Sequence, residues 1–126
     1  MDALFVDGVP KTDAAHIVID PSGLSDVLQK LRGRYGDLRI VISENGAAFR
    51  DDKDEEGNIH DPKRIEYLRS HLRSIQNAIA TGCNVQGYFV WTLIDTWEWT
   101  DGYDPRYGLV YLDLETQKRT PKSSYA

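Results

Sequence analysis

Hydrophobic residues recur at helical spacing in the first third of the chain. The stretch opens on Asp20 and Pro21, a pair typical of a helix N-terminus because the first helical position tolerates the missing proline N–H. It closes at Gly36, which is typical of a helix C-terminus. The apolar positions in between are Leu24, Val27, Leu28, Leu31 and Tyr35. This pattern predicts an amphipathic helix from Pro21 to just before Gly36.

A second helical pattern follows the same rules further along the chain. Asp61 and Pro62 repeat the start signal, and Gly82 stops the pattern. The apolar positions form one stripe, which consists of Ile65, Leu68, Leu72, Ile75 and Ile79. We expect this stripe to be the face that the helix buries.

Two other stretches predict β-strands. Residues 38–43 hold an apolar run of Leu38, Ile40, Val41 and Ile42, rich in β-branched residues, which is typical of a parallel strand buried on both faces. Residues 85–93 predict a second strand, and residues 109–114 a short extended segment. The charged residues 50–58 predict a solvated loop, and residues 118–126 form a polar tail.

The order of these elements places a β-α-β unit at the centre of the chain. Such a unit predicts two parallel strands joined by a right-handed crossover. Two parallel strands with helices on one side leave the other sheet face bare and both edges unpaired. The sequence therefore predicts that residues 1–126 are a single region that belongs to a larger parallel α/β structure.

Composition narrows the class of protein. The chain has 126 residues, 40% of them hydrophobic, and a net charge of −5, which argues against nucleic acid and anionic membrane surfaces as partners. Cys83 is the single cysteine, so an internal disulfide is impossible and a cytoplasmic location is expected. No run is apolar and long enough to span a bilayer. The three histidines, His16, His60 and His71, lack metal-ligand spacing, so no metal site is expected.

One carboxylate lies at the end of a predicted strand, a position that often holds active-site residues in parallel α/β folds. Glu44 follows the first predicted strand and precedes Gly46 in the run Ile-Ser-Glu-Asn-Gly at residues 42–46. The ends of parallel strands are the usual position of active-site residues. A surface glutamate in an ordinary turn is the alternative interpretation, and this stretch by itself does not separate the two.

All three tryptophans of the chain lie within nine residues, interleaved with acids. Trp91, Trp97 and Trp99 alternate with Asp95 and Glu98. Indole rings beside carboxylates suit a sugar, whose C–H faces pack on the rings and whose hydroxyls donate to the acids. The alternative is that the rings are core and the acids are caps. For Trp97, a core position and a binding-site position are equally good interpretations. The polar surroundings of Glu98 and Trp99 favour a binding site.

Several long motifs together resemble the β-glucosidase family of retaining glycoside hydrolases, called family one. Residues 42–46 are similar to its nucleophile signature, and residues 87–95 to its last barrel strand. Glu98 and Trp99 resemble its sugar-binding pair. Residues 102–103, 106–111 and 117–123 resemble the C-terminal continuation, so that the resemblance covers about residues 20–124.

The resemblance implies a fold and a set of roles. The fold class would be α/β, a partial (β/α)8 TIM barrel that comprises the last two strands with their flanking helices and is incomplete by itself. Glu44 would be the catalytic nucleophile. Trp91 would pack against the sugar, Glu98 would accept hydrogen bonds from its outer hydroxyls, and Trp99 would donate its indole N–H. No metal or organic cofactor is implied, and the substrate would be a small β-glucoside or β-galactoside.

The acid/base of the family is missing from this sequence. It lies in an Asn-Glu-Pro motif on an earlier strand, and the chain contains no such motif. Asp95 and Glu98 are poor replacements, because the first resembles a structural residue and the second a sugar ligand. The resemblance also implies that the chain stops where relatives begin a final helix.

Three functions stay open on the sequence. The chain could be the C-terminal part of a β-glucosidase, an inactive barrel fragment that self-associates, or a sugar-binding module without turnover. In each case we expect the bare strands to be covered by a second copy or by an N-terminal barrel fragment.

Overall fold

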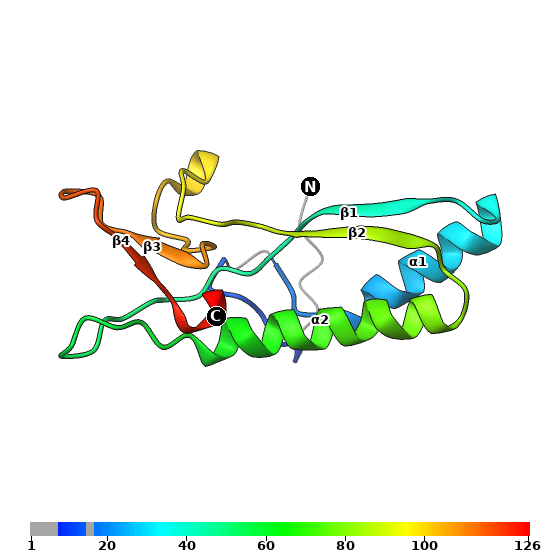
Figure 1. Cartoon of the computed structure of the whole chain (residues 1–126), viewed down its shortest axis with the longest axis horizontal. Coiled ribbons are helices and arrows are strands. Elements are labelled where there is room, and N and C mark those ends of the chain that lie inside the picture. Colours follow the sequence, from blue (N-terminus) through cyan, green and yellow to red (C-terminus); the bar gives the residue numbers. More distant parts are fainter. Residues whose placement is uncertain (1–7, 15–16) are drawn as a thin grey trace.

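The computed structural model describes residues 8–14 and 17–126. Along the chain lie α1 (Pro21–Tyr35), β1 (Ile40–Asn45), α2 (Pro62–Ala80), β2 (Val85–Val90), the 3-10 turn η1 (Trp99–Asp101), β3 (Val110–Leu112), β4 (Arg119–Pro121) and the 3-10 turn η2 (Ser123–Tyr125). The molecule is elongated (Figure 1). The helix α2 runs beneath β1 and β2, whereas β3 and β4 lie at the opposite end from the turn into β2.

The helix boundaries follow local chemistry. The Asp20 carboxylate accepts a hydrogen bond from the Gly23 N–H at 2.9 Å, which caps α1. Gly36 adopts a φ of 73° just past the end of α1, and Gly82 a φ of 98° just past α2, conformations that favour glycine. The predicted starts and ends of both helices are confirmed.

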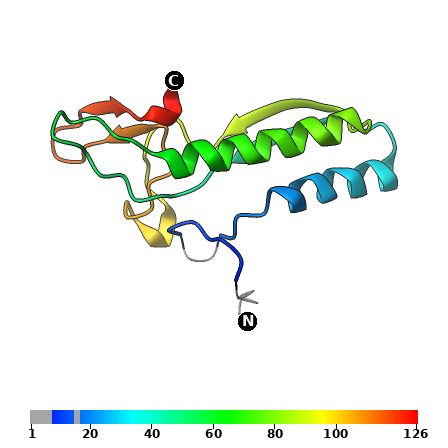
Figure 2. The same cartoon turned by 90° about the horizontal axis from the view of Figure 1, so that it is seen from below.

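The two long strands pair in parallel through the α2 crossover, as the β-α-β pattern predicts. Both helices cover the same face of this small sheet, which Figure 2 shows from below. The core between them contains Leu28 of α1, Ile75 and Ala78 of α2, and Cys83, with Ile40 and Ile42 of β1 packed against it. A second sheet of β3 and β4 is antiparallel.

The prediction of a strand buried on both faces is wrong. Burial alternates along β1, and its neighbour β2 shows the same exposure on the face away from the helices. Val41 is 56% exposed and Phe89 is 61% exposed. No layer of the described residues covers that face, so only the side chains that point at the helices are shielded. The observed bounds of β1 and β2 also differ from the expected 38–43 and 85–93.

The predicted buried face of α2 is also wrong in part. Leu72 is 46% exposed and Ile79 is 47% exposed, although Ile75 is buried. The buried positions include polar residues, namely Arg64, Tyr67, His71 and Ser74. These side chains are buried because they find partners. For example, the Ser74 hydroxyl donates to the Pro21 carbonyl of α1.

Two charged side chains lie inside the molecule where the sequence predicted solvated segments. Asp51 belongs to the charged loop 50–58 and Lys122 to the polar tail, yet both side chains are 0% exposed. They pair with each other, and long-range pairing of this kind leaves no local sequence signal. Among residues 8–14 and 17–126, no helix combines the length and apolarity needed to cross a membrane.

Candidate active site

A shallow hollow of about 280 Å³ lies at the C-terminal ends of β1 and β2. Its lining consists of Ile17, Glu44, Asn45, Gly46, Trp91, Glu98 and Tyr107. The structure therefore brings together three of the four expected site residues, since Glu44, Trp91 and Glu98 share this hollow. Trp99 lies outside the lining, in η1, and is 83% exposed.

Gly46 allows the two strand ends to meet. The Trp91 N–H donates to the Asn45 carbonyl at 3.0 Å, and the following peptide bond, to Thr92, is cis. A Cβ atom at Gly46 would lie 1.6 Å from the Trp91 carbonyl oxygen. A glycine is therefore required here for the nucleophile candidate and the indole ring to line one hollow.

Two tyrosines hold the residue next to Glu44. The Asn45 side-chain Nδ2 donates to the Tyr67 hydroxyl at 3.1 Å, and the Tyr88 hydroxyl donates to the Asn45 side-chain Oδ1 at 2.8 Å. Burial raises the pKa of Tyr88 to about 12, so its hydroxyl stays protonated and able to donate. Sequence reasoning missed both tyrosines, because they come from α2 and β2 and neither has a signal of its own.

Glu98 is the electrostatically unusual group of the hollow. Burial raises the pKa of its carboxyl, and a hydrogen bond from Trp91 opposes this effect. The neighbouring acids Asp101, Asp95 and Glu44 raise the Glu98 pKa further. Within the described part of the chain, Glu98 Oε1 is the one buried side-chain oxygen or nitrogen without a hydrogen-bond partner. An atom of this kind is expected to be satisfied by a ligand or by water.

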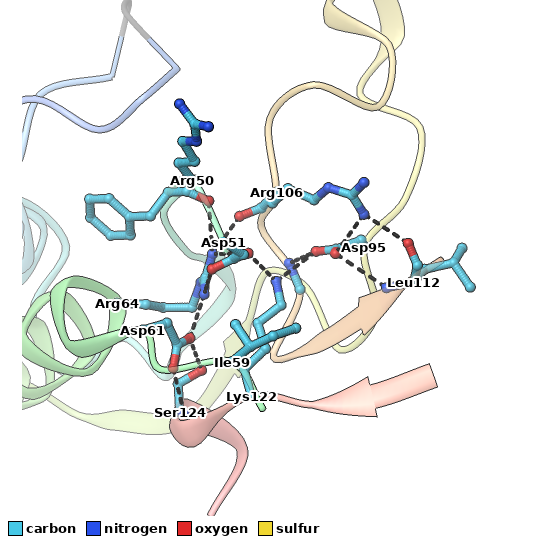
Figure 3. Close-up of polar contacts among 12 residues, drawn as sticks. Arg50, Asp51, Ile59, Asp61, Arg64, Asp95, Arg106, Leu112, Lys122 and Ser124 are labelled. Atoms are coloured by element: carbon cyan, nitrogen blue, oxygen red, sulfur yellow. Dashed lines mark hydrogen bonds and ion pairs between the residues drawn. The ribbon is translucent and has the colours of Figure 1, made fainter. Parts of the chain in front are cut away.

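Six charged side chains form a connected cluster, which we call the buried ion cluster (Figure 3). It consists of Asp51, Asp61, Arg64, Asp95, Arg106 and Lys122. Arg64 makes a two-pronged contact with Asp51 at 3.0 and 3.1 Å and also pairs with Asp61. Lys122 lies between Asp51 and Asp95, at 2.5 and 2.9 Å. Three acids thus face three bases.

Asp95 belongs to this cluster and not to the hollow. It is 3% exposed and accepts four hydrogen bonds. The donors are the Arg106 guanidinium, the Lys122 ammonium and the backbone N–H groups of Gly108 and Leu112. With its oxygens occupied in this way it cannot serve as a replacement acid, in agreement with the structural role that the resemblance implies.

Two of the three histidines have surroundings that indicate a structural role. His71 stacks on Tyr67 with ring centroids 3.9 Å apart, and His60 lies 3.1 Å from Asp54. His16 lies outside the described residues. Across residues 8–14 and 17–126, no group of three or more His, Cys, Asp and Glu side chains could hold a metal ion.

Comparison with known proteins decides the family. The sequence model of the protein family "Glycosyl hydrolase family 1" matches residues 5–126, which is nearly the whole chain. The chain belongs to glycosyl hydrolase family 1.

Family 1 relatives include enzymes of two specificities. The chain is 47% identical to a 6-phospho-beta-galactosidase of Streptococcus equi subsp. zooepidemicus over 117 residues, which are 92% of this chain and 24% of that protein. It is 43% identical to beta-glucosidase A of Thermotoga maritima over 116 residues, 92% of this chain and 26% of that protein. The chain therefore spans about a quarter of the length of these relatives.

Solved structures extend the family assignment to the fold. The family 1 β-glucosidase from Thermotoga maritima superimposes with a TM-score of 0.92 at 42% identity, over 96% of this chain and 27% of that chain. That neighbour is a TIM-barrel enzyme, and this family 1 chain matches a fragment of it. The described residues, 8–14 and 17–126, form two small sheets and not a closed barrel.

Proposed function

We propose that this chain supplies the nucleophile and part of the sugar-binding subsite of a retaining β-glycosidase that acts on terminal β-D-glucosides. The observation that carries the proposal is the pairing of two carboxylates in one hollow. Glu44 stands at the end of β1, and Glu98 lines the same hollow with a buried oxygen that lacks a partner among the described residues. A sugar hydroxyl would supply the missing donor.

Each residue would have a distinct role in this reaction. Glu44 attacks the anomeric carbon, the glycosidic C–O bond breaks, and a covalent glycosyl-enzyme forms. Trp91 presents its ring to the sugar face, and Glu98 accepts hydrogen bonds from the outer hydroxyls. The exposed Trp99 indole N–H donates to a hydroxyl at the rim.

The proton for the leaving group comes from outside this chain. A retaining enzyme needs a second carboxyl roughly 5–5.5 Å from the nucleophile as general acid/base. Asp95 is fully engaged in the buried ion cluster, and Glu98 is assigned to the sugar hydroxyls. We therefore assign the acid to another strand of the barrel.

The charge of the hollow favours an uncharged sugar over a sugar phosphate. Its described lining contains the two carboxylates Glu44 and Glu98 and no lysine, arginine or histidine. A phosphate group carries about −1.5 to −2 charges near neutral pH and is usually held by cations. The residues that this chain contributes therefore suit a glucoside better than a 6-phosphogalactoside.

The bare sheet face indicates what completes the site. Val41 and Phe89 project from β1 and β2 on the side away from the helices, and more than half of each side chain is exposed. We propose that further strands of a (β/α)8 barrel cover this face, in keeping with the barrel neighbour of which the chain matches about a quarter. The alternative is that a second copy of the chain covers this face. Light scattering of the purified chain tests this alternative, because it distinguishes a dimer from a monomer.

A chimera tests the proposed function. This chain replaces the matched stretch of Thermotoga maritima beta-glucosidase A, and hydrolysis of 4-nitrophenyl β-glucoside and its 6-phospho-β-galactoside counterpart is measured. We expect turnover of the glucoside, a preference for it over the phosphorylated sugar, and a loss on the order of 10⁴-fold or more in Glu44→Gln. Full activity of the Glu44→Gln chimera would contradict the assignment of the nucleophile, and a preference for the phosphorylated substrate would contradict the specificity.

A further inference from the structure

Lys122 reaches the interior from the far end of the chain. It follows β4, and its backbone N–H donates to the Leu109 carbonyl at 2.9 Å, which fixes the start of its side chain. The side chain itself is 0% exposed. A buried lysine with an extended stem has its ammonium group placed by whatever partners surround it.

Those partners are two carboxylates from different loops. The Lys122 ammonium donates to Asp51 Oδ2 at 2.5 Å and to Asp95 Oδ1 at 2.9 Å (Figure 3). Asp51 lies seven residues after Glu44, in the loop that leaves β1, and Asp95 lies three residues before Glu98, in the loop that leaves β2. One ammonium group therefore joins the loop that follows Glu44 and β1 to the loop that carries Glu98.

Each loop is also anchored on its own side of this link. Arg64 of α2 holds Asp51 and also donates to the Ala47 carbonyl at 3.4 Å, close behind Glu44. Asp95 is held by the backbone N–H of Gly108 at 2.9 Å. Because each loop is anchored in this way, the position of the Lys122 ammonium group determines the distance between the two loops.

We infer that Lys122 is a positioning residue that sets the separation of Glu44 and Glu98, an inference whose catalytic consequence rests on the proposed function. Replacing it by methionine leaves a side chain of similar length without charge. Asp51 keeps Arg64 and Asp95 keeps Arg106, but no cation then bridges the two carboxylates, and their mutual repulsion moves the two loops apart.

The structural consequence is measured in this chain without any substrate. Trp91 and Glu98 line the same hollow, so the indole N–H signal of Trp91 in NMR reports a change in the position of Glu98. In Lys122→Met we expect the signal to shift toward its position in Glu98→Ala. A folded Lys122→Met chain with an unshifted Trp91 signal would overturn the inference. If Lys122→Met does not fold, Asp51→Asn, which weakens the same link, is expected to give a smaller shift in the same direction, and an unshifted signal in that variant overturns it equally.

The kinetic consequence is measured in the chimera by a double-mutant cycle between Lys122 and Glu98. If Lys122 acts through Glu98, Lys122→Met lowers kcat/KM for the glucoside about tenfold in the parent but less than about threefold in the Glu98→Ala background. A purely structural lysine would give the same factor in both backgrounds, and that result would overturn the inference.

Two controls separate the possible failures. Lys118→Met changes an exposed lysine of the same segment and is expected to leave both the indole signal and kcat/KM unchanged. An inactive parent chimera would count against the proposed function, whereas the NMR experiment on this chain would still test the positioning by Lys122.

Discussion

The hollow and the buried ion cluster both follow the ends of β1 and β2, yet their carboxylates differ in whether they have cationic partners. In the cluster, three buried carboxylates meet three cations, and Asp95 alone accepts four hydrogen bonds. In the hollow, Glu44 and Glu98 have no cation in their described lining, and one Glu98 oxygen has no partner there. Because the chain pairs its acids where structure requires it, the unpaired acids indicate a place that is kept for a ligand.

Breaking the cluster at its most connected cation is expected to have the largest effect. Arg64→Met leaves Asp51 and Asp61 buried with a lost partner, and we expect the free energy of unfolding to fall by about 3–5 kcal/mol. Denaturant unfolding of the chain measures this. Arg69→Met on the same helix removes an exposed pair with Glu66, whose side chains are 55% and 63% exposed, and is expected to cost less than about 0.5 kcal/mol. Equal losses in both variants would contradict the contrast between paired burial and surface pairing.

Distorting the hollow without touching its acids is expected to lower activity strongly. In Gly46→Ala the new methyl group overlaps the Trp91 carbonyl oxygen, so the ends of β1 and β2 separate. A displacement of about 1 Å can reduce catalysis on the order of 100-fold, and we expect that loss in the chimera. Gly33→Ala, in the open interior of α1 where a Cβ meets no atom within 4 Å, is the matched control and should leave activity unchanged. Parent-like activity in Gly46→Ala would show that the close approach is unimportant.

Neutralising one acid in each region is expected to change stability in opposite directions. Glu98→Gln removes a charge that burial disfavours, so the free energy of unfolding at pH 7 should rise, by less than about 1 kcal/mol. Burial raises the Glu98 pKa above its usual 4.5, so the charged carboxylate destabilises the fold only above about pH 4.5, increasingly as the pH rises through the raised pKa. The stability gained in Glu98→Gln should therefore increase over the same pH range. Asp95→Asn, in the cluster, should instead destabilise the chain. Changes of the same sign at both positions would contradict the comparison.

The smallest effect concerns His71, which stacks on Tyr67. Burial lowers the pKa of His71 below its usual 6.5, although Asp20 and the Tyr67 carbonyl oppose this. The unfolded chain therefore binds the proton more readily, and the stability that the neutral ring contributes is complete above about pH 6.5 and is lost as the pH falls toward the lowered value. His71→Phe keeps an aromatic ring and should flatten the fall in stability between about pH 7.5 and 5.5. An unchanged pH dependence in this variant would contradict the role of His71.

Local features of the fold were predictable, and distant pairings were not. The boundaries of α1 and α2 follow from Asp-Pro starts and glycine ends, which act within one helical turn. The described residues supply no layer over the face of β1 that points away from the helices, so its apolar composition gave the wrong exposure for Val41. Lys122 and Asp51 are 71 residues apart in the sequence, and neither stands in a pattern that indicates a buried partner.

In the candidate site, too, local sequence motifs were predictable and distant contacts were not. Glu44, Trp91 and Glu98 stand in contiguous motifs, and the structure places them in one hollow. The hydrogen bonds that hold Asn45 come from Tyr67 and Tyr88, which become neighbours only when α2 packs under the strands. Side chains that touch the proposed sugar could therefore be found from the sequence, whereas the side chains that hold them required the fold.

Covalent trapping tests the central claim most directly. A 2-deoxy-2-fluoroglucoside with an activated leaving group slows the hydrolysis of a glycosyl-enzyme, so the chimera should gain the mass of one fluoroglucosyl group. Peptide mapping is expected to place that group on Glu44. A label on Glu98 or on any other carboxylate would contradict the account, as would a chimera that turns over glucoside but never accumulates label.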